Sequence, residues 1–121
     1  MTISKKQVYV VDDDESVCRA LKILLVAFGF EVKTFSSPES FFSAVPNSMK
    51  GCLVLDIHMP GMDGWEAIKK LIKSGATRPV IIITADKNGG LEEEAIGAGA
   101  RGFLQKPFHD QALINLIRKV Y

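Results

Sequence analysis

Three short segments without a charged residue constrain the fold of this chain most strongly. They are Val8–Val11, Cys52–Leu55 and Val80–Ile83. A strand that is apolar along its whole length must be covered on both faces, as it is in parallel sheets whose helical crossovers lie over them. Amphipathic stretches separate the three segments, so the sequence predicts an α/β fold around a buried parallel sheet.

Two further strands complete the predicted sheet and set its order. Segment 30–35 alternates in polarity and suits one edge, and the short segment 102–105 suits the other. Five strands then alternate with five helices, and right-handed crossovers give a doubly wound, flavodoxin-like sheet with strand order 2-1-3-4-5. We expect one domain over residues 1–121 and no output domain in this chain.

The predicted helices follow from capping residues and apolar spacing. Ser37 marks one helix start, Asp63 with Glu66 marks another, and Gly29 ends the first helix. Segment 88–100 contains several glycines, so its helix is expected to be the least rigid. The residues expected to face the core are Val17, Leu21, Leu24, Leu25, Phe28, Phe41, Phe42, Val45, Ile68, Leu71, Ile72, Leu113, Leu116, Ile117 and Val120.

Charge and composition exclude several functions. Fifteen basic and fourteen acidic residues leave a net charge of +1, which argues against direct nucleic-acid binding. No segment reaches the roughly 20 apolar residues of a membrane span, and the first residues show no signal-peptide pattern, so we expect a cytoplasmic protein without a membrane partner. Cys18 and Cys52 lie in apolar segments without metal-ligand spacing and are expected to be buried and inert.

Asp56 is the first candidate for chemistry, because an apolar strand has no folding reason to end on a carboxylate. The predicted topology brings to the same edge the polar residues that follow the other strands, namely Asp12, Asp13, Thr84 and Lys106. Three carboxylates would repel one another without a cation, and an all-oxygen set suits Mg²⁺. Asp56 would then be the nucleophile in a phosphoryl transfer, with Thr84 and Lys106 countering the added charge.

These residues also have structural explanations. The acidic run 12–15 suits a helix N-terminus, where Asp14 and Glu15 are the strongest candidates for that role and Asp13 is another. A threonine at a strand end fits ordinary β-propensity, and a lysine after a strand fits a solvated loop. The coincidence of all of them at one sheet edge favours a site.

Four short motifs carry a resemblance to a known family. They are the apolar strand into Asp12-Asp13, Leu55-Asp56 followed by Met59-Pro60 and Gly64, Ile83-Thr84-Ala85, and Lys106-Pro107-Phe108. In their order and spacing, the chain resembles the receiver domain of two-component response regulators over essentially its full length. The pattern of residues 91–100, together with Lys106-Pro107-Phe108, is most similar to receivers attached to a helix-turn-helix output domain.

The resemblance implies a stoichiometric phosphoacceptor, not an enzyme, that catalyses its own phosphorylation and dephosphorylation. Asp56 would receive the phosphoryl group from a sensor histidine kinase, a phosphotransfer protein or a small donor such as acetyl phosphate. The reaction would need Mg²⁺ (or Mn²⁺), bound directly by Asp13, Asp56 and the backbone carbonyl of His58, with Asp12 acting through water.

The resemblance also assigns a switch. Thr84 and Lys106 would hold phosphoryl oxygens, the Lys106-Pro107 bond would be cis, and Phe103 would be the aromatic switch residue. His58 and Asp86 would tune the lifetime of the acyl phosphate. The signal would pass to an output domain, a partner or a second copy through the face formed by residues 91–121.

Two other classes share this topology. A small aspartyl-phosphate hydrolase would also use a strand-end Asp, Mg²⁺, Thr and Lys, but such enzymes usually carry a second Asp where this chain has His58. A flavin-binding electron carrier needs a phosphate loop after the first strand, and Asp12 and Asp13 would repel phosphate there. Neither His58 nor His109 has other candidate metal ligands at a suitable spacing, so no metal-ligand or acid-base role is expected for either ring.

Overall fold

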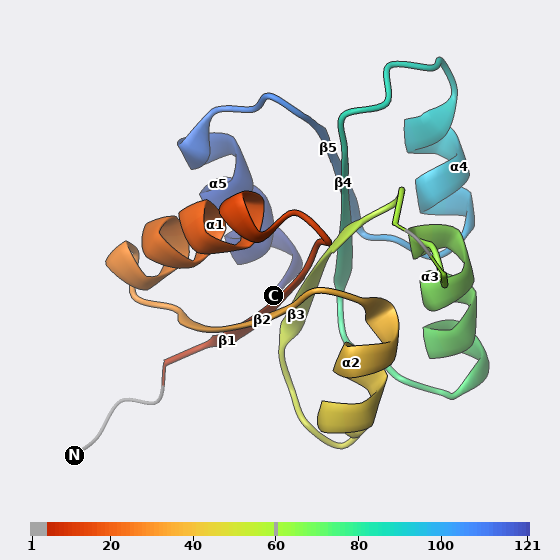
Figure 1. Cartoon of the computed structure of the whole chain (residues 1–121), viewed down its shortest axis with the longest axis horizontal. Helices are drawn as coiled ribbons and strands as arrows, with labels where there is room; N and C mark the ends of the chain where they lie inside the picture. Colours follow the sequence, from red (N-terminus) through yellow and green to blue (C-terminus); the bar gives the residue numbers. More distant parts are fainter. Residues whose placement is uncertain (1–4, 60) are drawn as a thin grey trace.

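A five-stranded parallel sheet forms the centre of the computed structural model, which describes residues 5–59 and 61–121 (Figure 1). The strand order is β2-β1-β3-β4-β5. The strands are β1 (Gln7–Val11), β2 (Glu31–Phe35), β3 (Cys52–Asp56), β4 (Val80–Thr84) and β5 (Gly102–Gln105). The predicted doubly wound α/β fold, its strand order and its parallel pairing are confirmed.

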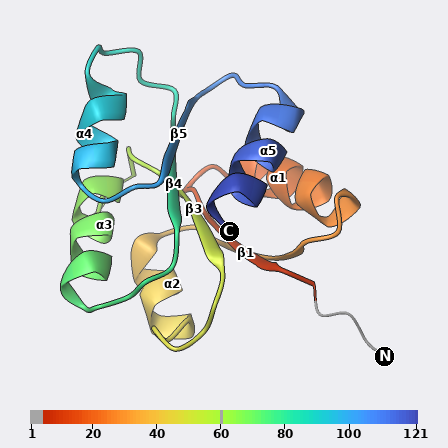
Figure 2. The same cartoon turned by 180° about the vertical axis from the view of Figure 1, so that it is seen from behind.

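Helices cover both faces of the sheet, as the apolar central strands require. They are α1 (Glu15–Ala27), α2 (Pro38–Ala44), α3 (Gly64–Lys73), α4 (Leu91–Gly97) and α5 (Asp110–Val120). Helices α1 and α5 lie on one face, and α2, α3 and α4 lie on the other (Figures 1 and 2). Successive strand residues alternate between two cores: Val8 and Val10 face α1 and α5, whereas Tyr9 and Val11 face the other layer.

Side-chain caps explain where most helices begin. The Asp14 carboxylate accepts a hydrogen bond from the Ser16 amide, and the Ser37 hydroxyl accepts one from the Ser40 amide. Asp63 accepts from the Glu66 amide at 2.9 Å, as the capping spacing predicts. Helix α4 differs, because it follows a glycine and has no side-chain cap. It is also much shorter than the predicted segment 88–100, in line with its weak helical sequence.

Two residues predicted to face the core are exposed instead. Phe28 is 40% exposed because α1 ends at Ala27, so its ring lies past the last helical turn, beside the Arg118 guanidinium. Ile72 is 54% exposed because it lies at the margin of the buried arc of α3. Within α5, Ile114 is fully buried, whereas Leu116 and Val120 are only partly buried against the same core; Val17, Leu24 and Phe42 are also partly buried.

Other sequence expectations hold for the described residues. Cys18 and Cys52 are buried free thiols, and burial raises the pKa of Cys52 to about 12, so this thiol stays protonated. Gly29 ends α1 with φ of +91°. The turn predicted at Pro60-Gly61, like the Met59-Pro60 motif, includes Pro60, which lies outside the described residues. No helix in the described ranges is long and apolar enough to cross a membrane.

Candidate functional site

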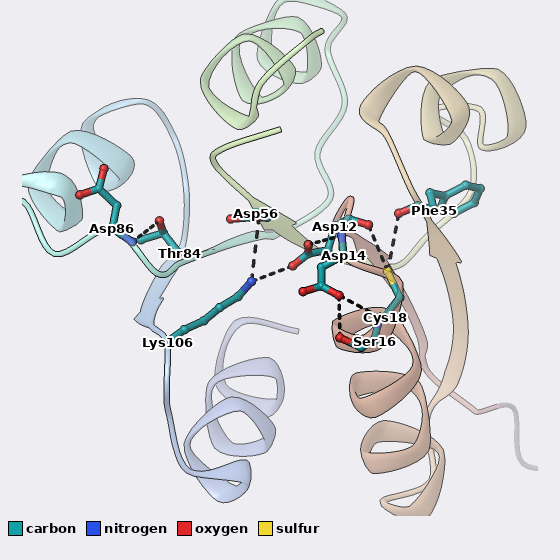
Figure 3. Close-up of polar contacts among 9 residues, drawn as sticks. All are labelled: Asp12, Asp14, Ser16, Cys18, Phe35, Asp56, Thr84, Asp86 and Lys106. Atoms are coloured by element: carbon teal, nitrogen blue, oxygen red, sulfur yellow. Dashed lines mark hydrogen bonds and ion pairs between the residues drawn. The ribbon is translucent and has the colours of Figure 1, made fainter. Parts of the chain in front are cut away.

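The carboxyl ends of β1, β3, β4 and β5 meet at one edge of the sheet. Parallel pairing sets Asp56 opposite Ile83 and Thr84 opposite Gln105, and Asp12 and Lys106 follow their strands directly. Figure 3 shows Asp12, Asp56 and Lys106 pointing toward one another at this edge. The predicted convergence of these three residues is therefore present.

Three carboxylates form an acidic cluster at this edge. Each of Asp12, Asp13 and Asp56 offers an oxygen within 4.8 Å of the other two. Asp12 is 1% exposed and Asp56 is 8% exposed, whereas Asp13 is open to solvent. Carboxylate oxygens are ligands that Mg²⁺ prefers, and an open side leaves room for the waters that this ion keeps. The residues present therefore fit a hard divalent cation.

Lys106 supplies one positive charge to the cluster. Its Nζ lies 2.8 Å from Asp12 Oδ2 and 4.0 Å from Asp56 Oδ2. One ammonium against three carboxylates leaves a net negative pocket, which favours a divalent cation. The sequence placed Lys106 near Asp56, and the structure shows it at 4.0 Å from that carboxylate with a closer contact to Asp12 that was not predicted.

Burial raises the pKa of Asp56, and the negative charge of Asp12 raises it further. Lys106 and the backbone amides of Ile57 and His58 act in the opposite direction. A carboxylate whose pKa is raised is more basic and more nucleophilic than one with an ordinary pKa, provided that it is ionised. The environment of Asp56 therefore suits a nucleophile that a cation keeps ionised.

The start of α1 holds Asp12 in place. Asp12 Oδ1 accepts a hydrogen bond from the Asp14 amide at 2.9 Å, and the Cys18 thiol lies 3.3 Å from the Asp12 carbonyl oxygen (Figure 3). Asp14 is the helix cap, and its hydrogen bonds with the Ser16 side chain and amide lower its pKa. The alternative that Asp13 caps this helix is wrong, because its neighbour occupies that position and leaves Asp13 free to face the cluster.

Thr84 lies at the same edge, but its hydroxyl does not join the cluster. Thr84 is fully buried, and its Oγ1 accepts a hydrogen bond from the Asp86 amide at 3.0 Å. Figure 3 shows its side chain beside Asp86 and away from Asp56. Within residues 5–59 and 61–121, its hydroxyl has no hydrogen bond to Asp56 or Lys106, so the predicted five-residue convergence is incomplete in this conformation.

A hydrogen bond between two side chains connects the two loops on either side of this edge. His58 Nε2 lies 2.7 Å from Asp86 Oδ2, which joins the loop after β3 to the loop after β4. The Asn88 amide and the His58 ring lower the pKa of Asp86. Gln105 also reaches this loop, donating from Nε2 to the Asp86 carbonyl at 3.3 Å. The sequence pointed to His58 and Asp86 separately, but residues 28 positions apart carry no local signal that they touch.

Gly64 sets how closely α3 approaches Asp56. Its amide donates to the Ile57 carbonyl at 2.7 Å. A Cβ at this position would lie 2.5 Å from the Asp56 carbonyl oxygen and 2.7 Å from the Ile57 Cα. Glycine is therefore required by contact with the backbone of the strand end, and the Gly64 of the sequence motif has a structural reason.

The remaining predicted residues lie near the site. Phe103 is partly buried against the core under α3 and α4. The Lys106-Pro107 peptide bond is cis, as expected. His109 is exposed at the N-terminal end of α5 and makes no side-chain cap there.

The fold and this edge together define a class: a doubly wound α/β domain with an acidic cation pocket beside a strand-end Asp and a paired Lys. The chain belongs to the response regulator receiver domain family, whose model matches residues 8–118. It is therefore a receiver domain of two-component signalling, a class that does not act as conventional enzymes.

Curated relatives support the same family. The chain is 38% identical over 114 residues to the transcriptional regulatory protein FixJ of Bradyrhizobium diazoefficiens, covering 94% of this chain and 56% of that protein. It is 38% identical over 118 residues to the response regulator protein TmoT of Ectopseudomonas mendocina, covering 98% and 54% respectively. The chain thus spans about half the length of these relatives.

Solved structures give the same result for the fold. The crystal structure of FixJ-N matches with a TM-score of 0.89 at 36% identity, covering 98% of this chain and 94% of that one. The response regulator StyR matches with a TM-score of 0.89 at 42% identity, covering 97% and 59% respectively.

Proposed function

We propose that Asp56 accepts a phosphoryl group in a Mg²⁺-dependent reaction and that the domain then changes conformation to control an output. One observation carries this proposal: the nearly buried Asp56 carboxylate lies beside two further carboxylates and within 4.0 Å of the Lys106 ammonium. An anion that must receive another anion needs positive charge close by. The Lys106 ammonium supplies one such charge, and a cation held by the carboxylates would supply the rest. The whole of residues 1–121 acts as a single receiver domain in this proposal.

In the proposed step, an oxygen of Asp56 attacks phosphorus while the bond from phosphorus to the donor breaks. With a phosphohistidine donor, a P–N bond is exchanged for a P–O bond, and the imidazole leaves with its electron pair and takes up a proton. Asp13, Asp56 and the backbone carbonyl of His58 would hold Mg²⁺ (or Mn²⁺), with Asp12 acting through water. When bound, the ion supplies charge neutralisation at the phosphoryl oxygens.

Lys106 and Thr84 act on the product. Lys106 is already near Asp56 and needs only a small movement to leave Asp12 for a phosphoryl oxygen. Thr84 must exchange its hydrogen bond from the Asp86 amide for one that it donates to the phosphoryl group. Phosphorylation therefore competes with a contact that holds the β4–α4 loop.

The proposed switch passes from this loop to Phe103 and α4. Movement of Thr84 vacates space that the Phe103 ring can fill, since both residues lie on neighbouring strands β4 and β5. Helix α4 has only seven residues, no side-chain cap, and Ala95 as its buried residue, so small changes in contact are enough to repack it. His58 and Asp86 tune the lifetime of the acyl phosphate from the edge of the pocket.

The proposed partners are a sensor histidine kinase or phosphotransfer protein as donor, and an output domain, a target or a second copy that binds the face formed by residues 91–121. Two relatives are named as transcriptional or response regulators, which supports a regulatory output attached to such a domain. We do not propose that this chain binds nucleic acid directly. We propose a cytoplasmic location, as expected from the sequence.

The test is the stoichiometry of labelling with radioactive acetyl phosphate and Mg²⁺. We expect about one retained phosphate per chain, lost in Asp56→Asn and unchanged in the matched control Asp110→Asn, an exposed acid on α5. Rapid multiple turnover on several phosphate esters would instead indicate the aspartyl-phosphate hydrolase. Labelling that survives in Asp56→Asn would remove Asp56 as the acceptor.

A further inference from the structure

A cleft lies at the opposite end of the sheet from Asp56. It encloses about 340 Å³ and is lined by the loops that enter β3, β4 and β5 together with the end of α5. Figure 2 shows the loops into β3 and β4 at the bottom of the molecule, at the amino ends of these strands. A volume of this size falls in the range that holds small molecules.

Three cationic side chains line this cleft, and none of its lining residues is Asp or Glu. They are Lys50, Arg78 and Arg101. Among the described residues, none of the three has a carboxylate within salt-bridge distance. The chain as a whole is nearly neutral, so this local excess of positive charge is not a reflection of composition.

Arg78 is held as a rigid part of the cleft. Its guanidinium carbon lies 5.5 Å from the Tyr9 ring centroid and 5.2 Å from that of Phe41. Its Nη2 donates to the Pro46 carbonyl at 2.9 Å, and the Tyr9 hydroxyl donates to the Lys50 carbonyl at 3.3 Å. The aromatic core thus fixes both the guanidinium and the backbone of the neighbouring loop.

Two of the three nitrogens of the same guanidinium have no hydrogen-bond partner among the described residues. These two nitrogens, Nε and Nη1, are buried. Within residues 5–59 and 61–121, no other buried side-chain nitrogen or oxygen atom of a non-exposed residue lacks a partner. Burial lowers the pKa of Arg78, because a charge here is poorly solvated. A partly desolvated cation is stabilised by an anion placed beside it. Because Nε and Nη1 have almost no accessible surface, a ligand in the cleft would contact this guanidinium through its Nη2, which is shared with the Pro46 carbonyl.

The other walls of the cleft are mixed: Asn47, Ser48 and Thr77 are polar, and part of the lining is apolar or aromatic. Met49, Val120 and Tyr121 line it, and the first and last of these are exposed. A ligand with an oxyanion at one end and an apolar body at the other would satisfy both kinds of wall. Inorganic anions would use only the cationic part.

We propose that this cleft binds a small organic oxyanion, a phosphate or carboxylate on an apolar or aromatic body, through Arg78, Arg101 and Lys50. The site is separate from the acidic edge and would operate whether or not Asp56 is phosphorylated. Binding there would contact the loops that lead into β3, β4 and β5 and the end of α5 together.

The test uses ¹H–¹⁵N NMR titration of the whole chain with phenyl phosphate in EDTA, with phenol and inorganic phosphate as comparison probes. We expect saturable shifts at the Gly51, Arg101 and Tyr121 amides, weaker binding of inorganic phosphate, and no saturation with phenol. Arg101→Gln and Lys50→Gln, both exposed positions, should each weaken binding about tenfold, or ~1.4 kcal/mol.

Lys69→Gln is the matched control, since it removes one exposed charge from α3 away from the cleft. Equal weakening by Lys69→Gln would reduce the effect to net charge and overturn the proposal. Shifts confined to the Asp56 edge, equal binding of phenol, or the absence of saturation would each overturn it as well.

Discussion

Lys106 Nζ lies 2.8 Å from Asp12 but 4.0 Å from Asp56, so in this conformation the lysine hydrogen-bonds to a candidate metal ligand and makes only a longer ion pair with the candidate acceptor. The ammonium and a divalent cation therefore compete for the same carboxylate. The lysine is also near enough to transfer its contact to a group added on Asp56. Its two roles predict opposite effects when its charge is removed.

Lys106→Gln should slow phosphoryl uptake while strengthening Mg²⁺ binding. Uptake should fall about 100-fold, because a preorganised cation is lost from the phosphoryl oxygens. Mg²⁺ affinity should rise, because Asp12 loses its competing ammonium. Acetyl phosphate labelling measures the first effect and isothermal titration calorimetry the second, with Lys69→Gln as the control. Mg²⁺ binding that weakens in Lys106→Gln would contradict the competition.

Asp56→Asn should stabilise the fold at neutral pH in the absence of Mg²⁺. Folding raises the pKa of Asp56, so the folded chain binds the Asp56 proton more tightly than the unfolded chain does. The free energy of unfolding therefore falls as the pH rises from the ordinary carboxyl pKa to the raised pKa. Removing the charge should raise the free energy of unfolding by about 1 kcal/mol at pH 7.

Urea unfolding of both proteins at several pH values measures this difference. The gap between them should begin to narrow as the pH falls below the raised pKa of Asp56 and should close below the ordinary carboxyl pKa, where the unfolded wild-type chain is protonated as well. Saturating Mg²⁺ should stabilise wild type more than the variant, because the variant lacks one ligand. A variant that is less stable than wild type at pH 7 without Mg²⁺ would contradict the repulsion in the cluster.

Gly64→Ala should destabilise the domain by about 3 kcal/mol, because its Cβ would press on the backbone of Asp56 and Ile57. Phosphoryl uptake should fall with it, since the acceptor strand end must shift. The control is Gly89→Ala, where a Cβ meets nothing within 4 Å. Thermal unfolding followed by circular dichroism compares the two, and equal melting temperatures would show that the close approach has no consequence.

The His58–Asp86 pair should act on the acyl phosphate as one unit. His58→Ala, Asp86→Ala and the double variant should change its lifetime by the same factor, because each breaks the same contact. Their effect on the free energy of unfolding should be small, because the His58 side chain is exposed and solvent screens the pair. Decay of the labelled protein gives the lifetimes, and multiplicative effects of the two single changes would mean that the residues act independently.

Sequence patterning determined the sheet and the set of residues at its carboxyl edge. Short apolar runs such as those leading to Val11 and Asp56, separated by amphipathic segments, indicate central parallel strands. Because such strands share one direction, the residues directly after them lie at one edge. The Gly29 stop and the caps at Ser37 and Asp63 depend on neighbouring residues alone, which is why they were predictable.

Only the tertiary structure decided how those side chains are directed. Rotation of Thr84 toward the Asp86 amide, the pairing of His58 with Asp86, and the choice of Asp12 over Asp56 by Lys106 depend on distances between elements far apart in the chain. The contact of the Arg78 guanidinium with the Tyr9 and Phe41 rings also depends on such distances. Local sequence encodes periodicity and caps, whereas which of several nearby partners a polar side chain takes is settled by packing across the assembled sheet.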